Sequence, residues 1–194
     1  MLNQLIVVGL GNPGEKYEYT RHNIGHLFID YLVQQYKLKK TPAKGAFYLY
    51  KKNLCQVKLL LVKTRTFMNI SDEAVISVVR QFNATPKELL VVCDDFNLPY
   101  GTIRLRLRGS DGGQKGLRSI ITRLGTQEIP RLRLGIGVDE PFDPIDFVLT
   151  PFSENEKESL TTIFNFAKRS LETYICNGPQ KAMSEFNKNV LDVK

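Results

Sequence analysis

Apolar residues recur along the chain with two different periods, and the alternation of these periods predicts strands separated by helices. Runs that are continuously apolar, or apolar at every second position, are typical of strands, whereas apolar positions three or four apart are typical of helices. The polar segment Lys51-Lys52-Asn53 is the expected turn between the second and third strands. The expected strands are residues 4–9, 46–50, 57–63, 89–93, 102–108 and 131–137. The expected helices are residues 23–35, 71–82 and 117–124, and two more within 153–188.

This order of elements predicts an α/β fold, organised as a single three-layer domain over residues 1–194. Its central sheet is expected to be mixed and partly parallel, with helices on both faces. Ser153 and Glu156 have the spacing of a capping box, which opens the C-terminal helices, and we expect these helices to pack on the domain. Ligands of such sheets gather at the carboxyl ends of the strands, so polar residues there are the first candidates for a site.

The composition of the 194 residues, 42% hydrophobic and 24% charged, is that of an ordinary globular chain. No apolar run reaches the roughly 18 residues of a membrane span. Because the first expected strand begins at residue 4, we expect no leader peptide. The three cysteines, Cys55, Cys93 and Cys176, are far apart and form no CxxC motif. We expect them to be reduced, buried thiols of a cytoplasmic protein, without a zinc ion.

The net charge of +7 is concentrated in one segment, because residues 100–135 contain eight Lys and Arg residues and only two acidic ones. Arginines alternate with aliphatic residues in 102–108 and again in 131–134, so on strands they would share a face. Aligned guanidinium groups repel one another unless a polyanion covers them, which favours binding of a nucleic-acid backbone over a merely solvated basic face. The arginines concerned are Arg104, Arg106, Arg108, Arg131 and Arg133.

A glycine-rich turn, GLGNPG at 9–14, follows the first strand and formally matches the dinucleotide-binding pattern G-x-G-x-x-G. A pyrophosphate site would need a helix that begins at the glycines, but the next expected helix begins nine residues after Gly14, and Pro13 has no N–H to donate. No acidic residue ends a second strand about twenty residues further on. The glycines therefore favour a tight bend that presents the Asn12 amide to a ligand, with a purely turn-forming Asn12 as the alternative.

The only two histidines, His22 and His26, have the spacing of a helical metal pair, but neither a Glu between them nor a third histidine completes one. His22 lies near the glycine turn, and an imidazole can act as a general base near neutral pH. Its second ring nitrogen needs an orienting partner, which Asp94 or Asp95 could supply at the end of strand 89–93. Paired aspartates also suit Mg²⁺, although no phosphate-loop lysine accompanies them.

Nucleophilic side chains are poorer candidates, because the chain has no G-x-S-x-G motif. Cys93 could pair with His22, but it continues an apolar run, which favours a position in the core. Asn69 follows strand 57–63 and is expected at the same edge of the sheet as Asn12. A His/Asp/Asn site beside a basic track indicates hydrolysis, by an activated water, of a bond attached to RNA.

Several ordered motifs carry a family resemblance: VVGLGNPG at 7–14, TRHNIG at 20–25, TFMNIS at 66–71, DDFNLPYGTIRLRLRGSDGGQKGLRSI at 94–120 and RLRLGIG at 131–137. With these motifs the sequence resembles the bacterial type of peptidyl-tRNA hydrolase along nearly its whole length. The resemblance implies a usually monomeric α/β enzyme that cleaves the ester between a peptide and the 3′ end of its tRNA. It also implies that no metal and no cofactor take part.

The resemblance further implies a role for each candidate residue. His22 would be the general base for the attacking water, and Asp94 would keep it basic and in the correct tautomer. Asn12 and Asn69 would hold the peptide main chain, and Asn69 would also help to position the reacting carbonyl. The remaining residues with implied roles are Tyr17 and Phe67, beside the peptide and the terminal nucleotide, and Arg104, Arg106 and Arg133, on the tRNA phosphates.

Two positions depart from the family pattern. His-Asn commonly follows the paired glycines, whereas Gln114-Lys115 stand here; Lys115 could bind phosphate, but it lacks the acceptor with which an asparagine orders a water. Cys93 stands where a histidine is often found, and we interpret it as a packing residue. The alternatives are a non-enzymatic RNA-binding relative, which the intact His, Asp and Asn set disfavours, and a nicotinamide oxidoreductase, which would have to bind NAD(P).

Overall fold

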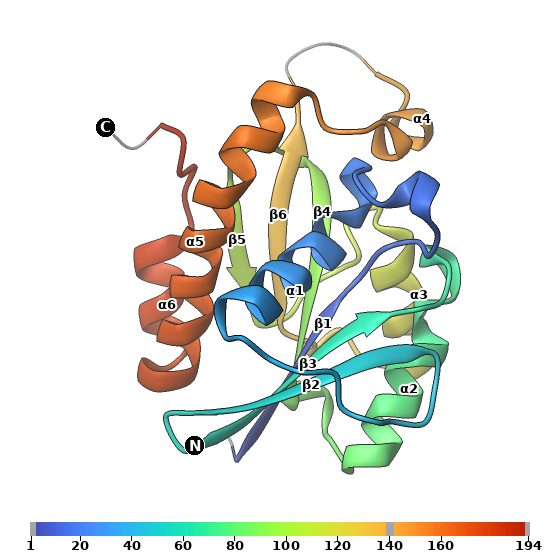
Figure 1. The fold of residues 1–194 in the computed structure, drawn as a ribbon, viewed down its shortest axis with the longest axis vertical. Coiled ribbons are helices and arrows are strands. Elements are labelled where there is room, and N and C mark those ends of the chain that lie inside the picture. Colours follow the sequence, from blue (N-terminus) through green and yellow to red (C-terminus); the bar gives the residue numbers. More distant parts are fainter. Residues whose placement is uncertain (1–2, 139–141, 193–194) are drawn as a thin grey trace.

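Six strands form one mixed sheet, which is the middle layer of the computed structural model (Figure 1). The structure describes residues 3–138 and 142–192. The strands lie in the order β2-β3-β1-β4-β6-β5; the four inner strands are parallel, and each edge strand runs antiparallel to its neighbour. Their bounds are β1 Gln4–Gly9, β2 Phe47–Leu54, β3 Val57–Thr64, β4 Leu89–Pro99, β5 Ile103–Arg106 and β6 Arg131–Gly137.

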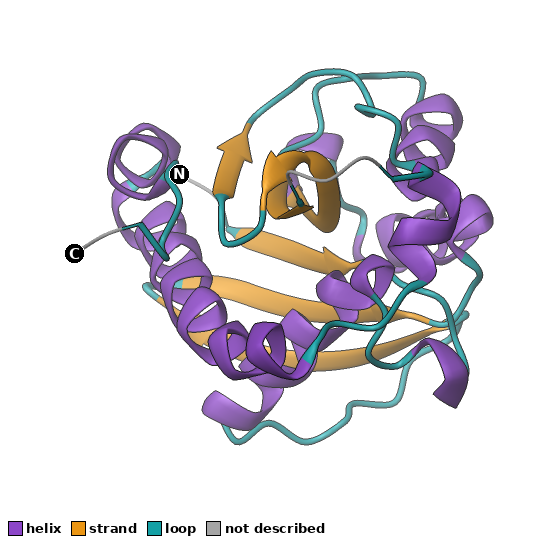
Figure 2. Cartoon of the chain, turned by 90° about the horizontal axis from the view of Figure 1, so that it is seen from above, coloured by secondary structure: helices purple, strands orange, loops and turns teal. Residues whose placement is uncertain are grey.

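Helices cover both faces of the sheet, which confirms the predicted three-layer α/β fold (Figures 1 and 2). Successive strand residues point to opposite faces, so Val7 packs with α1 and α5 while Val8 packs with α2 and α3. The bounds of the helices are α1 Ile24–Gln35, α2 Ser71–Phe82, α3 Lys115–Leu124, α4 Pro144–Leu149, α5 Glu154–Asn177 and α6 Pro179–Phe186. In the part of the chain that the structure describes, no helix combines the length and the apolar character that a membrane span needs.

Strand β4 is longer than the sequence predicts, because it continues through Asp94 and Asp95 to Pro99. Aspartate is disfavoured in strands, which is why the pattern placed the end of this strand at Cys93. Both aspartates instead remain paired with β6, opposite Leu134 and Gly135. As neighbours on one strand they point to opposite faces of the sheet, so the two carboxylates cannot serve the same site.

The hairpin between β2 and β3 turns at Cys55-Gln56 and not at Lys51-Lys52-Asn53, so that expectation is wrong. Leu54 pairs with Val57, which leaves a two-residue loop whose φ angles are both positive, 47° at Cys55 and 65° at Gln56. Such loops favour Asn and Gly, and their absence here removed the usual sequence signal for the turn.

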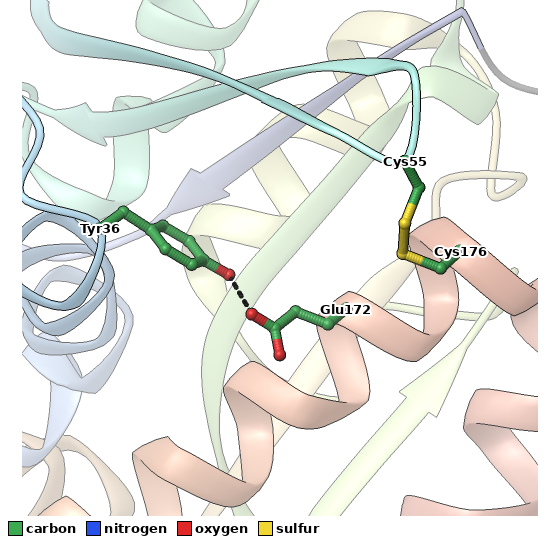
Figure 3. The surroundings of a disulfide bond; sticks show 4 residues. All are labelled: Tyr36, Cys55, Glu172 and Cys176. Atoms are coloured by element: carbon green, nitrogen blue, oxygen red, sulfur yellow. Dashed lines mark hydrogen bonds between the residues drawn. A yellow bond between two sulfur atoms is a disulfide. The ribbon is translucent and has the colours of Figure 1, made fainter.

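Cys55 and Cys176 form a disulfide, so the expectation of reduced thiols is wrong for these two residues (Figure 3). The bond joins the β2–β3 turn to the last turn of α5 across a sequence separation of 121 residues. Nearby, the Tyr36 hydroxyl donates to the Glu172 carboxylate at 2.9 Å, which also links the end of α1 to α5. Cys93 is buried and free, as expected.

Glycines allow α1 to begin directly against the end of β1. A Cβ at Gly9 would lie 2.4 Å from the carbonyl oxygen of Gly25, and a Cβ at Gly25 would lie 2.6 Å from that of Leu10. A Cβ at Gly11 would come within 2.6 Å of the His26 ring. The glycines are therefore explained by close packing, and α1 begins at Ile24, ten residues beyond the last glycine of the turn, which does not fit a dinucleotide site.

Candidate active site

His22 and Asp94 lie together at the carboxyl end of the parallel strands. His22 belongs to a 3-10 turn, Arg21–Asn23, that leads into α1, and its Nδ1 lies 2.8 Å from Oδ2 of Asp94. Both side chains are buried, with 9% and 2% of their surface exposed. A carboxylate can only accept, so Nδ1 carries a proton, and in the neutral imidazole Nε2 is the nitrogen with the free electron pair. Among the described residues no group hydrogen-bonds to Nε2, and His22 lines a cavity.

Asp95 points to the other face of the sheet, which decides between the two aspartates. Its Oδ2 lies 3.1 Å from Arg133, and its Oδ1 accepts the Asn97 N–H at 2.9 Å. The carboxylate partner of His22 is thus Asp94. No group of three or more His, Cys, Asp or Glu side chains gathers around a possible metal position within residues 3–138 and 142–192.

Asn12 is held in one orientation by two neighbouring segments. Its Oδ1 accepts the Met68 N–H at 2.8 Å, which identifies the amide oxygen, and no group in residues 3–138 or 142–192 accepts from the Asn12 Nδ2. The Asn23 side chain holds the Asn12 backbone from both sides, since Oδ1 accepts the Asn12 N–H at 2.7 Å and Nδ2 donates to the Asn12 carbonyl at 3.0 Å. Asn12 lines the same cavity as His22, so its free N–H group is available to a ligand there.

The cavity has a volume of about 380 Å³, and we refer to its polar lining residues as the polar wall and to its apolar lining residues as the apolar wall. The polar wall contains His22, Asp94, Asn12 and Asn69, so the structure brings together the four residues that the sequence predicted as catalytic. Asn69 is exposed on the 3-10 turn Met68–Ile70 that follows β3. The residues of the apolar wall that belong to α4 are Pro144, Ile145, Val148 and Leu149.

Two aromatic residues lie beside the cavity. Tyr17 lines it, and Phe67 packs edge-to-face on Tyr17 with 6.4 Å between the ring centroids. Phe67 is 51% exposed, which is unusual for a phenylalanine, and it does not itself line the cavity. The pair therefore extends the apolar surface from the cavity onto the outside of the protein.

His26 and Cys93 take no part in the site. His26 is buried against the Thr64 hydroxyl at 2.9 Å, so the two histidines do not converge. Burial, with a contribution from Lys63, lowers the pKa of His26 to about 3, and it is neutral at any ordinary pH. Burial raises the pKa of the Cys93 thiol, which packs on the opposite face of the sheet from Asp94, so Cys93 is no nucleophile for His22.

A family model described as peptidyl-tRNA hydrolase matches residues 6–193. This chain belongs to the peptidyl-tRNA hydrolase family. The peptidyl-tRNA hydrolase of Thermotoga petrophila is 46% identical over 185 residues, which cover 94% of this chain and 97% of the relative. That of Aquifex aeolicus is 41% identical over 187 residues, covering 96% and 97%. The crystal structure of the Acinetobacter baumannii peptidyl-tRNA hydrolase matches with a TM-score of 0.87 and 29% identity over 96% of each chain.

In this member of the peptidyl-tRNA hydrolase family, the basic strands are only partly exposed. Arg104 and Arg106 alternate with buried Ile103 and Leu105 on β5, as predicted, and no described carboxylate lies within salt-bridge distance of either arginine. Arg131, expected on the same exposed face, is 1% exposed, and that expectation is wrong.

Backbone carbonyl groups explain why two arginines of β6 turn inward. Arg131 donates to the carbonyl oxygens of Ile129, Ser110 and Gln127, which satisfies its guanidinium without solvent. Arg133, beside Arg104 in the sheet, is 18% exposed, because it pairs with Asp95 and donates to the Ser110 carbonyl. Lys115 is exposed on the rim of the cavity.

Arg21, next to His22, supports the site and was not among the predicted residues. It forms a bidentate pair with Glu156 on α5, at 2.6 and 2.9 Å, and stacks on the rings of Phe147 and Phe152. Burial alone would raise the pKa of the Glu156 carboxyl, but hydrogen bonds from Arg21 and Ser153 outweigh it and hold this pKa below its ordinary value. The pair fastens the His22 turn to α5, and the Arg21 N–H also donates to the carbonyl of Thr150, directly after α4, at 3.0 Å.

The supporting roles of Asn23 and Gln114 were also not predicted from the sequence. Asn23 stands directly after His22 in TRHNIG, so its position next to a candidate residue was a usable signal. Gln114, the N-cap residue of α3, donates to Oδ1 of Asp94 at 3.0 Å. This contact joins residues 20 positions apart, with the end of β4, strand β5 and a loop between them, and no periodicity in the sequence indicates it.

Proposed function

We propose that this chain hydrolyses the ester bond of peptidyl-tRNA in the cavity at the carboxyl end of its parallel strands, with His22 as the general base. One observation carries the proposal: His22 Nδ1 lies 2.8 Å from Asp94 Oδ2 on the wall of a cavity that Asn12 and Asn69 also line. Membership of the peptidyl-tRNA hydrolase family supports the class of substrate.

The reaction needs one base that later acts as an acid. Nε2 of His22 takes a proton from a water while the water oxygen attacks the ester carbonyl carbon. The Asp94 carboxylate stabilises the resulting imidazolium through Nδ1–H and does not itself take the proton. The bond between the carbonyl carbon and the ribose oxygen then breaks, and the imidazolium returns its proton to that oxygen. The products are a peptide with a free carboxyl group and a tRNA with a free ribose hydroxyl.

Two amide side chains would select a peptide over a single amino acid. The free Nδ2 of Asn12 can donate to a peptide carbonyl, because its Oδ1 already accepts the Met68 N–H. Asn69 offers both a donor and an acceptor on the same wall and would position the reacting carbonyl. The apolar wall and the Tyr17–Phe67 pair suit the peptide side chains and the terminal base of the tRNA.

The tRNA phosphates would lie along β5, where Arg104 and Arg106 are exposed, with Arg133 adding positive charge beside them. Lys115 on the rim of the cavity would meet the phosphates of the 3′ end. All of these groups come from one chain acting as one unit, so we propose a monomer, and we place its action in the cytoplasm, where translation supplies the substrate.

The test is turnover of an N-blocked aminoacyl-tRNA, with the same tRNA carrying an unblocked amino acid as the matched control. We expect repeated release of free tRNA from the blocked substrate and much slower release from the control. Binding without turnover would contradict the proposal and support a non-enzymatic RNA-binding protein. Equal rates on the two substrates would contradict the role given to Asn12 and Asn69.

A further inference from the structure

The Gln114 side chain connects a helix end to the proposed catalytic carboxylate. It is 6% exposed and caps α3, since its Oε1 accepts the Leu117 N–H at 2.7 Å. Because that N–H can donate only to the oxygen, the direction of the amide is fixed, and Nε2 faces Asp94. Nε2 lies 3.0 Å from Oδ1 of Asp94 and 3.1 Å from the Met68 sulfur.

Both oxygens of the Asp94 carboxylate are therefore engaged. Oδ2 accepts from His22, and Oδ1 accepts from Gln114. A carboxylate held at one oxygen alone could rotate about its Cβ–Cγ bond and carry the imidazole with it. The second donor removes that freedom, because it comes from a side chain that is itself fixed on the first turn of a helix.

We propose that Gln114 is a positioning residue, which holds the Asp94 carboxylate in the plane that keeps Nδ1 of His22 protonated and directs Nε2 into the cavity. This inference rests on the proposed function, since it concerns the same reaction. It also gives a meaning to the departure from the family pattern at this position. The histidine that is common in the family at this position has a ring that, when neutral, offers one donor and one acceptor. The Gln114 carboxamide also offers both, so its oxygen can cap α3 while its nitrogen donates to Asp94.

Gln114→Ser separates the two tasks of the side chain. Serine is a good N-cap residue and can still accept from the Leu117 N–H, but it is too short to reach Asp94. We expect kcat to fall by about tenfold or more, the factor that a hydrogen bond to a charged group can supply, while KM stays within about twofold. Gln114→Ala removes the cap as well, so it should lower the melting temperature further without a further loss of kcat.

Gln114→His is the conservative rescue, because its ring can donate to Asp94 and accept from Leu117, and it should restore most of kcat. The orientation of His22 can be followed without turnover, by NMR of the ring-bound protons in ¹⁵N-histidine-labelled protein. Gln114→Ser should broaden or remove the hydrogen-bonded Nδ1–H signal of His22. The signal of His26, bound to Thr64, is the internal control and should not change.

Two results would overturn the inference. The first is a wild-type kcat together with an unchanged His22 signal in Gln114→Ser. The second is a loss of kcat that is larger in Gln114→Ala than in Gln114→Ser, in proportion to the larger loss of melting temperature. Failure of the proposed function would look different, since wild-type protein would then not hydrolyse N-blocked aminoacyl-tRNA at all. The NMR comparison would still report whether Gln114 orients the His22–Asp94 pair.

Discussion

The two ends of the parallel strands are held together by different kinds of bond. At the carboxyl end, buried hydrogen bonds join His22, Asp94 and Gln114 around a cavity. At the amino end, the disulfide between Cys55 and Cys176 fastens the β2–β3 turn to α5. The first set is a network of hydrogen bonds that orients His22, the proposed general base, whereas the second is a covalent link at the opposite end of the strands.

This difference indicates that activity and stability are separable in this chain. The carboxyl end needs groups in a defined protonation state, and changing one of them should alter the rate while the sheet and its two cores remain. The amino end restricts the unfolded chain, and changing it should alter stability while the rate remains. The predictions below test this separation, in order of decreasing expected effect.

Of the changes to the groups around His22, Asp94→Asn should have the largest effect on activity. An amide at this position can donate to His22 Nδ1, which favours the tautomer with a proton on Nε2, and that nitrogen can then no longer accept a proton from water. We expect kcat/KM for N-blocked aminoacyl-tRNA to fall by about 10²- to 10⁴-fold and its pH profile to change shape. Wild-type kcat/KM in a folded Asp94→Asn protein would contradict the role of the carboxylate.

Loss of the disulfide should have the largest effect on stability. Replacing Cys55 and Cys176 together by serine should lower the free energy of unfolding by about 2–4 kcal/mol, because the bond closes a long loop in the unfolded chain. Denaturant unfolding measures this loss, and kcat should stay unchanged.

Reductant supplies the control for the disulfide prediction. It should destabilise the wild-type protein by a similar amount and leave the double variant unaffected. Thiol titration of the unfolded, unreduced wild type should find one free thiol, that of Cys93. Three free thiols in oxidised protein would show that the bond is absent.

His26 gives a smaller, pH-dependent effect that belongs to the fold alone. The pKa of His26 is lowered from 6.5 to about 3 in the folded protein, so below pH 6.5 the unfolded chain binds a proton that the folded chain does not. Stability should therefore fall with decreasing pH between these values, by up to about 1.4 kcal/mol per pH unit. His26→Gln removes this contribution, and unfolding curves at pH 7 and pH 5 should show a shallower decline than wild type. An equal decline would contradict the buried, neutral state of His26.

The arginines of β5 should show the smallest effect. Replacing Arg104 and Arg106 by alanine should raise KM several-fold and reduce the slope of log KM against log salt by about one to two, because up to two phosphate contacts are lost. Arg80, exposed on α2, is the matched control, and Arg80→Ala should change neither quantity. An unchanged slope in the β5 variant would place the tRNA on another surface.

Local patterns predicted the elements and the edge at which the site lies. The apolar run of β1 and the amphipathic pattern of the helices predicted the three layers. The carboxyl ends of β1, β3 and β4 meet at one edge of the sheet, which places Asn12, Asn69 and Asp94 around the same cavity. The choice between Asp94 and Asp95 was open, because it depends on β4 continuing as a strand and so pointing the two side chains apart.

Contacts between distant segments could not be predicted from local patterns. The disulfide depends on how α5 crosses the sheet, and the inward turn of Arg131 depends on three backbone carbonyl groups that the loops present to it. The apolar wall of α4 was missed because a helix of six residues is too short to show a period.

The most direct test of the central claim is His22→Ala, measured both for single-turnover cleavage of saturating N-blocked aminoacyl-tRNA and for binding of the same tRNA. If His22 is the general base, cleavage should slow by about 10²- to 10⁴-fold while the dissociation constant stays within about twofold. Cleavage at the wild-type rate, with tRNA still bound, would contradict the account and require another base.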